Sequence, residues 1–476
     1  MKRLAALILA IIVVATLAFA SCDKITGTSN SPGDPSTNST DDIIDPDSST
    51  TSATTIAPEN RVINVYSPTD EVPRIIMKYM ELHPEIDYKV NMFTFATADM
   101  AFQVALDHAL AAGGSDAPDI YSLEIAQALK YSQGEQAHYA SPYKDLGIDV
   151  DTLAKDADIA QYSLDIGTNP EGEIVGLGYQ GTGGAFIYRR SIAKSVWGTD
   201  DPAIIGYIIG PGWDRFFEAA ADLKAQGYGI VSGDGDIWHS IENSADKPWI
   251  VDGKLHIDPK REAFLDYAKL LQDNGFSNNT RDWSDEWFAD MKGTGQKEIF
   301  GFFGPSWLIN YVMLSNCGGE KPGEGTYGDW AVCEPPAAFF WSGNWIFANK
   351  NSKHKEVIGD ILEWITLDSS ETGLQHSWAN GTYDVNNPVL DTVTSGTVMK
   401  KATGTLDFLG NQKNMYVVFD IAAKQAKGNN KTQYDEMINS YWREQVREYT
   451  AGSKSREQAI NDFKLTVRDN LDIVAE

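Results

Sequence analysis

Short runs of alternating apolar and polar residues near residue 61 are each followed by apolar residues at helical spacing. Residues 61–67 (RVINVYS) alternate and are rich in β-branched side chains, which predicts a strand. An amphipathic helix is predicted next from the three- and four-residue spacing of Val72, Ile75, Ile76, Tyr79 and Met80. Residues 87–95 (DYKVNMFTF) and 117–123 (APDIYSL) repeat the strand pattern. A second helical segment between them carries Phe102, Ala105, Leu106 and Ala109.

Further helical patterns continue along the chain. Residues 216–223 predict a helix that ends at Gly227, and residues 357–365 predict another. A last helix is expected to start at Ser455, where Gln458 completes a capping box. Strands that alternate with helices favour parallel sheets covered by helices on both faces. A chain of 476 residues is too long for one ordinary core, so two substantial lobes are expected.

The first 22 residues have the layout of an export signal. Lys2 and Arg3 precede an uncharged apolar run at residues 4–20, and Ser21 and Cys22 follow it. The run is slightly short for a membrane span. Its end, LAFASC, resembles a bacterial lipobox, in which the cysteine becomes the lipidated first residue after cleavage; Phe19 departs from the aliphatic preference of that pattern. An uncleaved anchor and a plain signal peptide are the alternatives, and each also places the remainder outside the cell.

Residues 23–60 contain Ser, Thr, Asp, Pro, Gly and Asn in abundance, no aromatic residue and one lysine. Such a segment buries too little apolar surface to offset its ordering entropy, so we expect a disordered tether. The tether would let a folded body stand off the membrane.

The formal net charge of −28 argues against a nucleic-acid partner, because phosphate binding needs a basic surface. The only cysteines besides Cys22 are Cys317 and Cys333, which either form a disulfide in an oxidising compartment or stay as two thiols. The sequence shows no zinc or redox spacing, so we expect no metal and no cofactor.

All thirteen tryptophans lie after residue 190. Flat aromatic faces stack on the apolar C–H faces of sugar rings, so a cleft for neutral oligosaccharides favours tryptophan together with carboxylate and amide acceptors. For any one of them, packing in the core is the commoner role. Trp364 is expected in the core, and Trp213 is expected to pack next to its helix.

Enzyme motifs are absent from the sequence. It contains no GxSxG elbow, HExxH helix or phosphate-binding P-loop, and GYQGTGGAF lacks the third glycine of a dinucleotide site. We therefore interpret this glycine-rich segment as a flexible crossing between lobes. The acidic pair Asp234 and Asp236 in SGDGDIW could belong to a glycosidase or a calcium loop, but GDGD is first of all typical of a turn.

Several segments, in order, resemble the extracellular solute-binding family 1 of ABC importers, the group that includes maltose-binding protein. The resemblance runs from about Arg61 to the C-terminus. It is carried by INVYSPTDE, APDIYSLE, GGAFIYRR, GPGWDRFFEAAADLKAQG, FFGPSWLINY, GDWAVCEPP, NWIFANKNSKHKEVIGDILEWIT and MINSYWREQVREYTAGSKSREQAINDFK. Pro211 and Gly212 replace the pair that usually precedes the tryptophan of the fourth segment.

The resemblance implies an α/β fold of the type II periplasmic-binding-protein kind, with two doubly wound lobes joined by a three-crossing hinge. Lobe I is expected to comprise residues 61–184 plus 331–380, and lobe II residues 185–330 plus 381–476. The ligand would lie between the lobes, at the C-terminal ends of the strands. Carried over by position, the implied ligand-binding residues are Tyr66, Asp70, Glu124, Trp238, Trp307, Trp345, Trp378, Asp384, Tyr441 and Trp442. For Asp70, capping of the helix that follows is an equal alternative.

The expected function is that of a lipid-anchored, monomeric, non-enzymatic binding protein on the outer face of a bacterial cell membrane. It would capture a neutral carbohydrate, hold it between closing lobes and deliver it to ABC permease subunits. A surface glycoside hydrolase is one rival reading, and would need two carboxylates at catalytic separation in one groove. The other rival keeps the clamp but binds a peptide, a polyamine or a metal chelate.

Overall fold

The computed structural model describes residues 61–94, 101–384, 386 and 388–475. The chain divides into two units, Met1–Thr55 and Ile56–Glu476, and all described residues belong to the second. The export signal, the lipidation of Cys22 and the tether at residues 23–60 lie outside the described residues and stay predictions.

The larger of two main sheets has five strands in the order β2-β1-β3-β10-β4. Their bounds are β1 Val62–Ser67, β2 Lys89–Thr94, β3 Ile120–Glu124, β4 Gly176–Leu177 and β10 Asn344–Ala348. The strands predicted at residues 61–67, 87–95 and 117–123 are therefore confirmed. β1 pairs in parallel with β2 and β3, but β10 runs antiparallel to β3 and β4, so the expectation of parallel strands throughout is wrong for this sheet.

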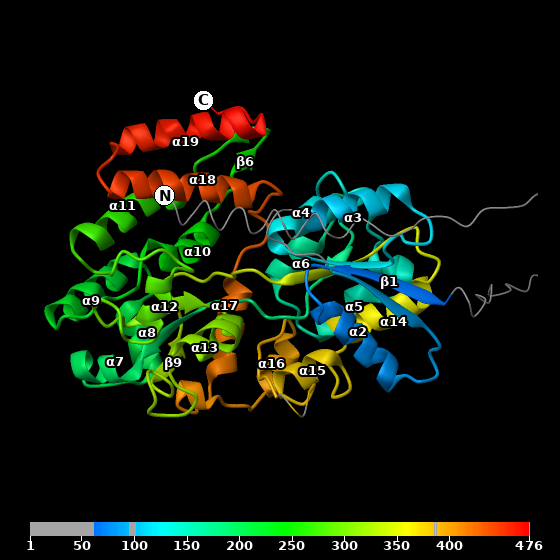
Figure 1. The fold of residues 1–476 in the computed structure, drawn as a ribbon, viewed down its shortest axis with the longest axis horizontal. Helices are drawn as coiled ribbons and strands as arrows, with labels where there is room; N and C mark the ends of the chain where they lie inside the picture. The colour runs from blue at the N-terminus through cyan, green and yellow to red at the C-terminus, as the bar shows by residue number, and fades with distance from the viewer. Residues whose placement is uncertain (1–60, 95–100, 385, 387, 476) are drawn as a thin grey trace, which may run out of the picture. The chain divides into compact units, whose positions relative to one another are not determined.

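Helices cover both faces of this sheet, as expected, with α3 and α4 on one side and α2 and α14 on the other (Figure 1). The strands alternate accordingly: Ile63 and Val65 pack with the residues of α2 and α14, whereas Tyr121 and Leu123 pack with those of α3 and α4. The helices whose residues follow or flank these strands are α2 Glu71–Leu82, α3 Ala101–Ala112, α4 Ile125–Ser132, η3 Ala137–Tyr139, η4 Tyr143–Leu146, α5 Val150–Asp156, α6 Gln161–Gly167, α14 Lys355–Thr366 and α15 Leu374–Ala379.

The smaller sheet has the order β8-β5-β9, with β5 Ala185–Arg189, β8 Gly301–Gly304 and β9 Trp330–Cys333. Both of its ladders are antiparallel. Residues from 331 onward are expected in lobe I, whereas β9 pairs with β5 in the smaller sheet. A separate hairpin joins β6 Ile250–Val251 to β7 Lys254–Leu255.

The remaining helices include the three that the sequence predicts most clearly. α9 begins at Trp213, α14 covers the predicted residues 357–365, and α19 has Ser455 as its N-cap with Gln458 completing the capping box. Their bounds and those of the others are α7 Arg190–Trp197, α8 Pro202–Ile209, α9 Trp213–Ala225, α10 Asp234–Ser244, α11 Pro259–Asp273, α12 Asp285–Met291, η5 Leu308–Met313, α13 Leu314–Asn316, α16 Gly396–Lys401, η6 Asp407–Leu409, α17 Met415–Gln425, α18 Asp435–Thr450 and α19 Arg456–Leu471.

The segment GDGD is not a turn, and this prediction is wrong. It begins α10, because the Asp236 carboxylate accepts hydrogen bonds from the backbone N–H groups of Ser232 and Gly233 at 2.9 and 3.0 Å. An acidic side chain in the first turn also interacts favourably with the positive end of the helix dipole. The same residues that suggested a turn therefore start a helix.

Three connecting segments run side by side between the two sheets. The first, residues 178–184, forms bridges to Phe340 in the second and to Val393 in the third. Backbone hydrogen bonds join Gly181 to Thr392, and Gly184 to Phe339. The predicted three-crossing α/β fold is confirmed. Cys317 and Cys333 are both buried free thiols. Of the two alternatives, a disulfide and two unpaired thiols, the structure has the second.

Candidate functional site

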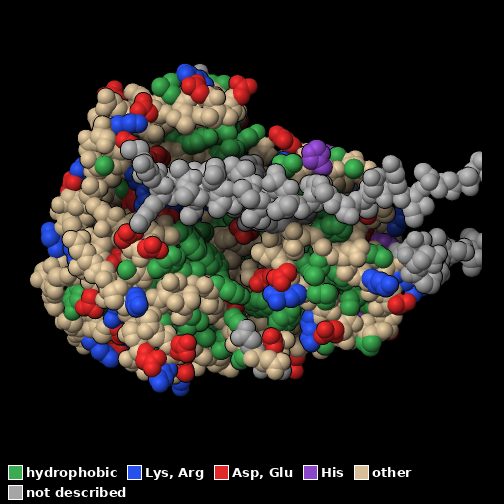
Figure 2. Space-filling view, in the orientation of Figure 1, with side chains coloured by type: hydrophobic (Ala, Val, Ile, Leu, Met, Phe, Trp, Pro, Cys, Tyr) green, Lys and Arg blue, Asp and Glu red, His purple; other side chains and the backbone are tan. Residues whose placement is uncertain are grey.

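Three tryptophans from separate parts of the chain form one aromatic cluster, the indole cluster, made of Trp283, Trp307 and Trp341. The rings of Trp283 and Trp307 are nearly parallel, with centroids 6.4 Å apart and an angle of 8°. Trp341 meets both edge-on, at centroid distances of 6.2 and 4.9 Å. Trp283 is 50% exposed, and the other two are half-buried. Figure 2 shows hydrophobic side chains gathered around a hollow in the face that carries α10 and α12.

Each indole is held by the end of a structural element. Trp307 follows β8 and directly precedes η5, and its Nε1 donates to the backbone oxygen of Trp341 at 3.0 Å. Trp341 lies in the second connecting segment, between β9 and β10. Trp283 lies just before α12 and has a backbone φ of +66°, a left-handed conformation that bulky residues seldom adopt. Such strain gathers at ligand-binding sites and persists only where the surroundings enforce it.

His239 extends the cluster from α10. Its ring stacks on Trp341 with a centroid distance of 4.2 Å and an angle of 21°. Burial lowers the pKa of His239 to about 3, and the Arg443 cation lowers it further. The imidazole is therefore neutral at physiological pH, and it presents a flat aromatic face without charge.

A half-buried ion cluster supports the loop of Trp283. Asp282 accepts hydrogen bonds from Arg443 at 2.6 Å and from Arg447 at 3.2 Å. Burial alone would raise the pKa of Asp282, but the two guanidinium groups outweigh burial and hold the pKa below its ordinary value. The carboxylate is therefore charged, and it ties the loop to α18.

A second group of polar residues lies where α2 begins. Glu71, in the first turn of α2, accepts hydrogen bonds from the Tyr179 hydroxyl and from Gln180 Nε2, the latter at 3.2 Å. Burial raises the pKa of Glu71 against the opposing effect of Tyr179. Tyr311 is 49% exposed. Burial is the largest cause that raises its pKa, and the negative charges of Asp391 and Glu71 raise it further. Tyr311 lies on η5, the helix that Trp307 precedes, so this group and the indole cluster share one element.

Glu124 and Glu436 bring carboxylates from two distant segments close enough to interact. Glu124 precedes α4 at the end of β3, and Glu436 is in the first turn of α18. Burial raises the pKa of each, and the charge of Glu436 raises the pKa of Glu124 further. Glu124 is half-buried and Glu436 is exposed, and ionised carboxylates are strong acceptors for hydroxyl groups.

Asp391 is a buried carboxyl beside the connecting segments, with 2% of its surface exposed. It accepts a hydrogen bond from the Thr392 N–H at 2.7 Å and another from the Ser306 hydroxyl. Burial raises its pKa from 3.8 to about 6, although these hydrogen bonds oppose the shift. A pKa that is higher in the folded state stabilises the fold below pH 4, and this contribution is lost as the pH rises through 6.

Asp391→Asn is therefore expected to stabilise the protein at pH 8 by about 2 kcal/mol and to leave stability unchanged at pH 4, since the amide never ionises. Urea unfolding of wild type and variant at both pH values measures the difference. Asp384→Asn is the control, because Asp384 is exposed and its charge stays in water. A gain that is equal at pH 4 and pH 8 would contradict this account of Asp391.

Only one of the ten predicted ligand-binding residues, Trp307, belongs to the indole cluster. Trp238, Trp345 and Trp442 are at most 1% exposed. Trp238 packs on Phe264, Trp442 packs on Phe463, and Trp345 Nε1 donates to the Ser163 carbonyl. Their burial gives no support to a ligand-binding role, which stays a prediction. The expected core position of Trp364 is confirmed at 7% exposure.

The other predicted residues lie apart from the cluster. Tyr66 is buried, its ring stacks on Phe93, and its hydroxyl donates a hydrogen bond to the Asp116 carbonyl. Asp70 pairs with Arg74 at 3.2 Å and makes no side-chain cap hydrogen bond, so the capping alternative is wrong. Trp378 is 7% exposed and packs on Tyr179 and Tyr383. Asp384 is exposed, and Tyr441 is half-buried beside the core of the smaller sheet. Their roles, and that of Glu124, stay predictions.

Sequence reasoning missed Trp283, Trp341, His239, Glu71 and Tyr311. Trp341 could have been found, because it directly precedes SGNW, between the segments GDWAVCEPP and NWIFANKNSKHKEVIGDILEWIT that carry the family resemblance. Trp283 and His239 gave no such signal, since their approach to Trp341 depends on how three separate segments pack.

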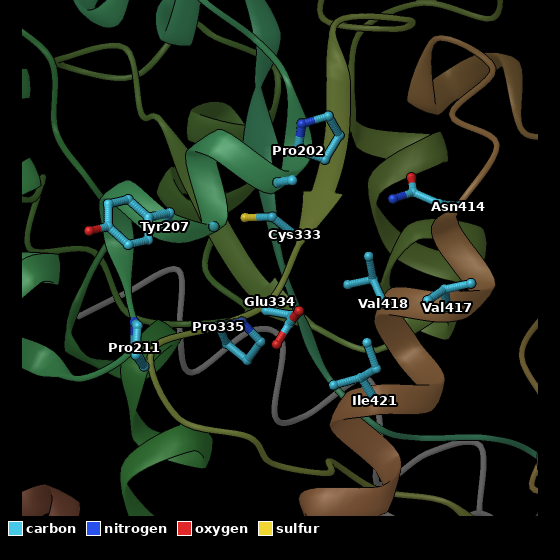
Figure 3. A pocket seen from close by; sticks show the side chains of 12 residues that line it. Pro202, Tyr207, Pro211, Cys333, Glu334, Pro335, Asn414, Val417, Val418 and Ile421 are labelled. Atoms are coloured by element: carbon cyan, nitrogen blue, oxygen red, sulfur yellow. The ribbon is translucent and has the colours of Figure 1, made fainter.

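A groove of about 350 Å³ lies elsewhere, between α8 and α17 (Figure 3). Pro202 and Tyr207 form one wall, Val417, Val418 and Ile421 the other, and Cys333 to Pro335 the floor. It contains no tryptophan, and Glu334 is its only charged lining residue. The indole cluster is the better candidate for a carbohydrate, because it offers flat aromatic faces, and the carboxylates of Glu242 and Asp282 act on His239 beside it.

Within residues 61–94, 101–384 and 388–475, no group of three or more His, Cys, Asp or Glu side chains could hold a metal ion. In the same ranges, no helix has both the length and the apolar character needed to cross a membrane.

Solved structures with the same fold are numerous. A crystal structure of an extracellular solute-binding protein of family 1 is 18% identical, with a TM-score of 0.69, and the match covers 84% of this chain and 97% of that one. The galacto-N-biose-/lacto-N-biose I-binding protein of the ABC transporter from Bifidobacterium longum, in complex with lacto-N-biose, is 16% identical, with a TM-score of 0.60 and coverage of 87% and 98%. The sugar-binding protein MalE from Xanthomonas citri is 15% identical, with a TM-score of 0.64 and coverage of 86% and 96%. These similarities establish the fold.

No curated protein matches the sequence. A protein family does match, over residues 75–406, which is more than half of the 476-residue chain. The family is described as bacterial extracellular solute-binding protein, and the matched range includes most of α2, every strand of the larger sheet except β1, the whole smaller sheet and all three indoles of the cluster. The chain therefore belongs to the bacterial extracellular solute-binding protein family.

Proposed function

We propose that this protein is the extracytoplasmic binding component of an ABC importer, and that it captures a neutral carbohydrate, most simply an oligosaccharide, between two lobes. The indole cluster is the observation that carries the proposal. Three indoles within 6.4 Å of one another, one of them half exposed, form a surface large enough for more than one sugar ring.

The imidazole that stacks on the cluster, and the carboxyls of Glu71, Glu124 and Glu436 elsewhere on the two sheets and their helices, suit hydroxyls better than anions. His239 is neutral, and Glu71, Glu124 and Glu436 are carboxyls whose pKa is raised by burial. Carboxylates accept hydrogen bonds from sugar hydroxyls and repel anionic ligands. Arg443 and Arg447 are already engaged by Asp282, so they add little attraction for an anion.

Proteins of the same fold support a sugar as the ligand. The Bifidobacterium longum protein is described in complex with lacto-N-biose, and the Xanthomonas citri protein as sugar-binding. At 15–16% identity these are relatives in fold, so the ligand of this chain is inferred from its own indoles.

The lobes, the anchor and the partner complete the proposal. Lobe I is expected at residues 61–184 plus 331–380 and lobe II at residues 185–330 plus 381–476; because β9 pairs with β5, residues 331–333 are assigned to lobe II instead of lobe I. Cys22 carries a lipid that holds the monomer on the outer face of the membrane. Ligand contacts made only in the closed state shift the hinge equilibrium, and the closed form delivers the sugar to permease subunits without chemical change.

A thermal-shift screen of the purified full-length chain tests this proposal. A ligand that binds only the folded state stabilises it by about 2.7 kcal/mol at one hundred times its Kd, so the Tm should rise with one or a few neutral oligosaccharides. Peptides and polyamines, tested in parallel, should leave the Tm unchanged. A Tm rise with these alone would favour a non-sugar solute, and release of sugar products during incubation would favour a glycoside hydrolase.

A further inference from the structure

Thr182, in the first connecting segment, is fully buried. It forms hydrogen bonds with Tyr162 of α6 and with the second connecting segment. Its N–H donates to the Tyr162 hydroxyl at 2.8 Å, and its Oγ1 lies 3.1 Å from the same hydroxyl. Its Oγ1 also donates to the Ser342 carbonyl at 3.0 Å. Its own carbonyl accepts a hydrogen bond from the Trp341 N–H at 3.0 Å.

The direction of every hydrogen bond in this group can be assigned. A carbonyl only accepts, so the Thr182 hydroxyl must give its single proton to Ser342. The Tyr162 hydroxyl accepts from the Thr182 N–H, and its own proton is then free to go to Thr182 Oγ1. The result is a continuous chain of donors from Tyr162 through Thr182 to Ser342, with each proton used.

The two ends of this chain belong to different parts of the fold. Tyr162 lies on α6, which packs against α4 and β4 of the larger sheet. Trp341 and Ser342 lead into the indole cluster, because the Trp341 carbonyl accepts from Trp307 Nε1 and its ring stacks on His239. Thr182 therefore connects the larger sheet to the aromatic surface beside the smaller one.

The backbone at Ser342 and Gly343 depends on the same contact. Ser342 has a φ of +61° and Gly343 a φ of +120°, both in the left-handed region. A Cβ at Gly343 would come within 3.3 Å of the Thr182 side chain and 3.2 Å of Trp345. The turn that presents Trp341 is thus packed against Thr182, and its Ser342 carbonyl is held by the Thr182 hydroxyl.

We propose that Thr182 is a positioning residue. It holds Trp341, and through Trp341 also Trp307, in the arrangement that binds a ligand. It also couples ligand binding to the segments that join the two sheets. This inference rests on the proposed function, since it assumes that the indole cluster receives the carbohydrate. Thr182 itself touches no ligand.

The test compares Thr182→Val, which has the same shape without the hydroxyl, with Thr182→Ser, which keeps it. The carbohydrate found for the wild type is titrated into each purified full-length variant, and affinity and tryptophan emission are recorded. Thr182→Val should bind about tenfold more weakly, because the Ser342 carbonyl and the Tyr162 hydroxyl each lose a partner. Its ligand-induced emission change should also shrink, whereas Thr182→Ser should recover both properties.

Thr366→Val is the matched control. Thr366 is equally buried, and its hydroxyl donates to the Leu362 carbonyl within α14, away from the connecting segments. It should leave affinity and the emission change as in the wild type. If Thr182→Val does not fold, Tyr162→Phe removes the other hydroxyl of the chain and should weaken binding in the same direction.

Wild-type affinity in Thr182→Val, or equal losses in Thr182→Val and Thr182→Ser, would overturn the inference. Wild-type affinity in Tyr162→Phe would overturn it as well. A wild-type chain that binds no carbohydrate would instead refute the proposed function, so the two failures are distinguishable.

Discussion

Replacing Trp307 with alanine is expected to weaken carbohydrate binding by about 1–3 kcal/mol, which is roughly 5- to 150-fold in Kd. The substitution removes the ring that lies parallel to Trp283 and the Nε1 donor that holds the Trp341 carbonyl. Both a stacking surface and its support are lost, so the effect should exceed that of removing Trp283 alone. Isothermal titration calorimetry with the carbohydrate identified by screening measures the change.

Trp197→Ala is the control for general destabilisation. Trp197 is also half-buried, its Nε1 donates to Asp222, and its ring packs on Phe300 away from the indole cluster. This variant should lose some stability but keep its affinity. Unchanged affinity in Trp307→Ala would remove Trp307 from the site.

Arg261→Ala is expected to give a large loss of stability, about 3–5 kcal/mol in the free energy of unfolding. Arg261 is fully buried, pairs with Glu242 at 3.5 Å and donates to the Lys247 carbonyl at 2.8 Å. Its guanidinium also lies over the Trp249 ring at 4.6 Å. Truncation leaves the buried Glu242 carboxylate with Lys431 as its remaining cation and opens a cavity beside Trp249.

Denaturant unfolding of Arg261→Ala and Lys260→Ala gives the comparison. Lys260 is adjacent in sequence, but its pair with Asp246 is exposed to solvent, so its loss should cost about 0–1 kcal/mol. Losses of similar size in the two variants would mean that the buried network adds nothing beyond a surface ion pair.

Local sequence patterns predict a helix or strand correctly where its formation depends on neighbouring residues alone. The alternation at residues 61–67 reflects a strand with a helix on each face, and the Ser455 capping box is satisfied within four residues. Strands that alternate with helices favour a parallel sheet, but β10 is antiparallel to its neighbours. Its direction depends instead on the chain returning from the smaller sheet, which leaves no local signal.

The site was harder to predict than the fold. A tryptophan suits a core as well as a sugar-binding surface, so Trp238, Trp345 and Trp442 could not be distinguished from Trp307 by residue type. His239, Trp283 and Trp341 lie 44 to 102 residues apart in the sequence and come together only in the folded chain. Their meeting depends on Thr182 and on the Asp282 ion cluster, neither of which has a recognisable motif.

The crystal structure of the complex with the carbohydrate that raises the Tm tests the central claim most directly. We expect sugar rings to lie with their C–H faces against Trp283, Trp307 or Trp341, and their hydroxyls to reach carboxylates such as Glu71 or Glu124. A ligand seated elsewhere, for example in the groove between α8 and α17, or one that touches none of the three indoles, would contradict the account.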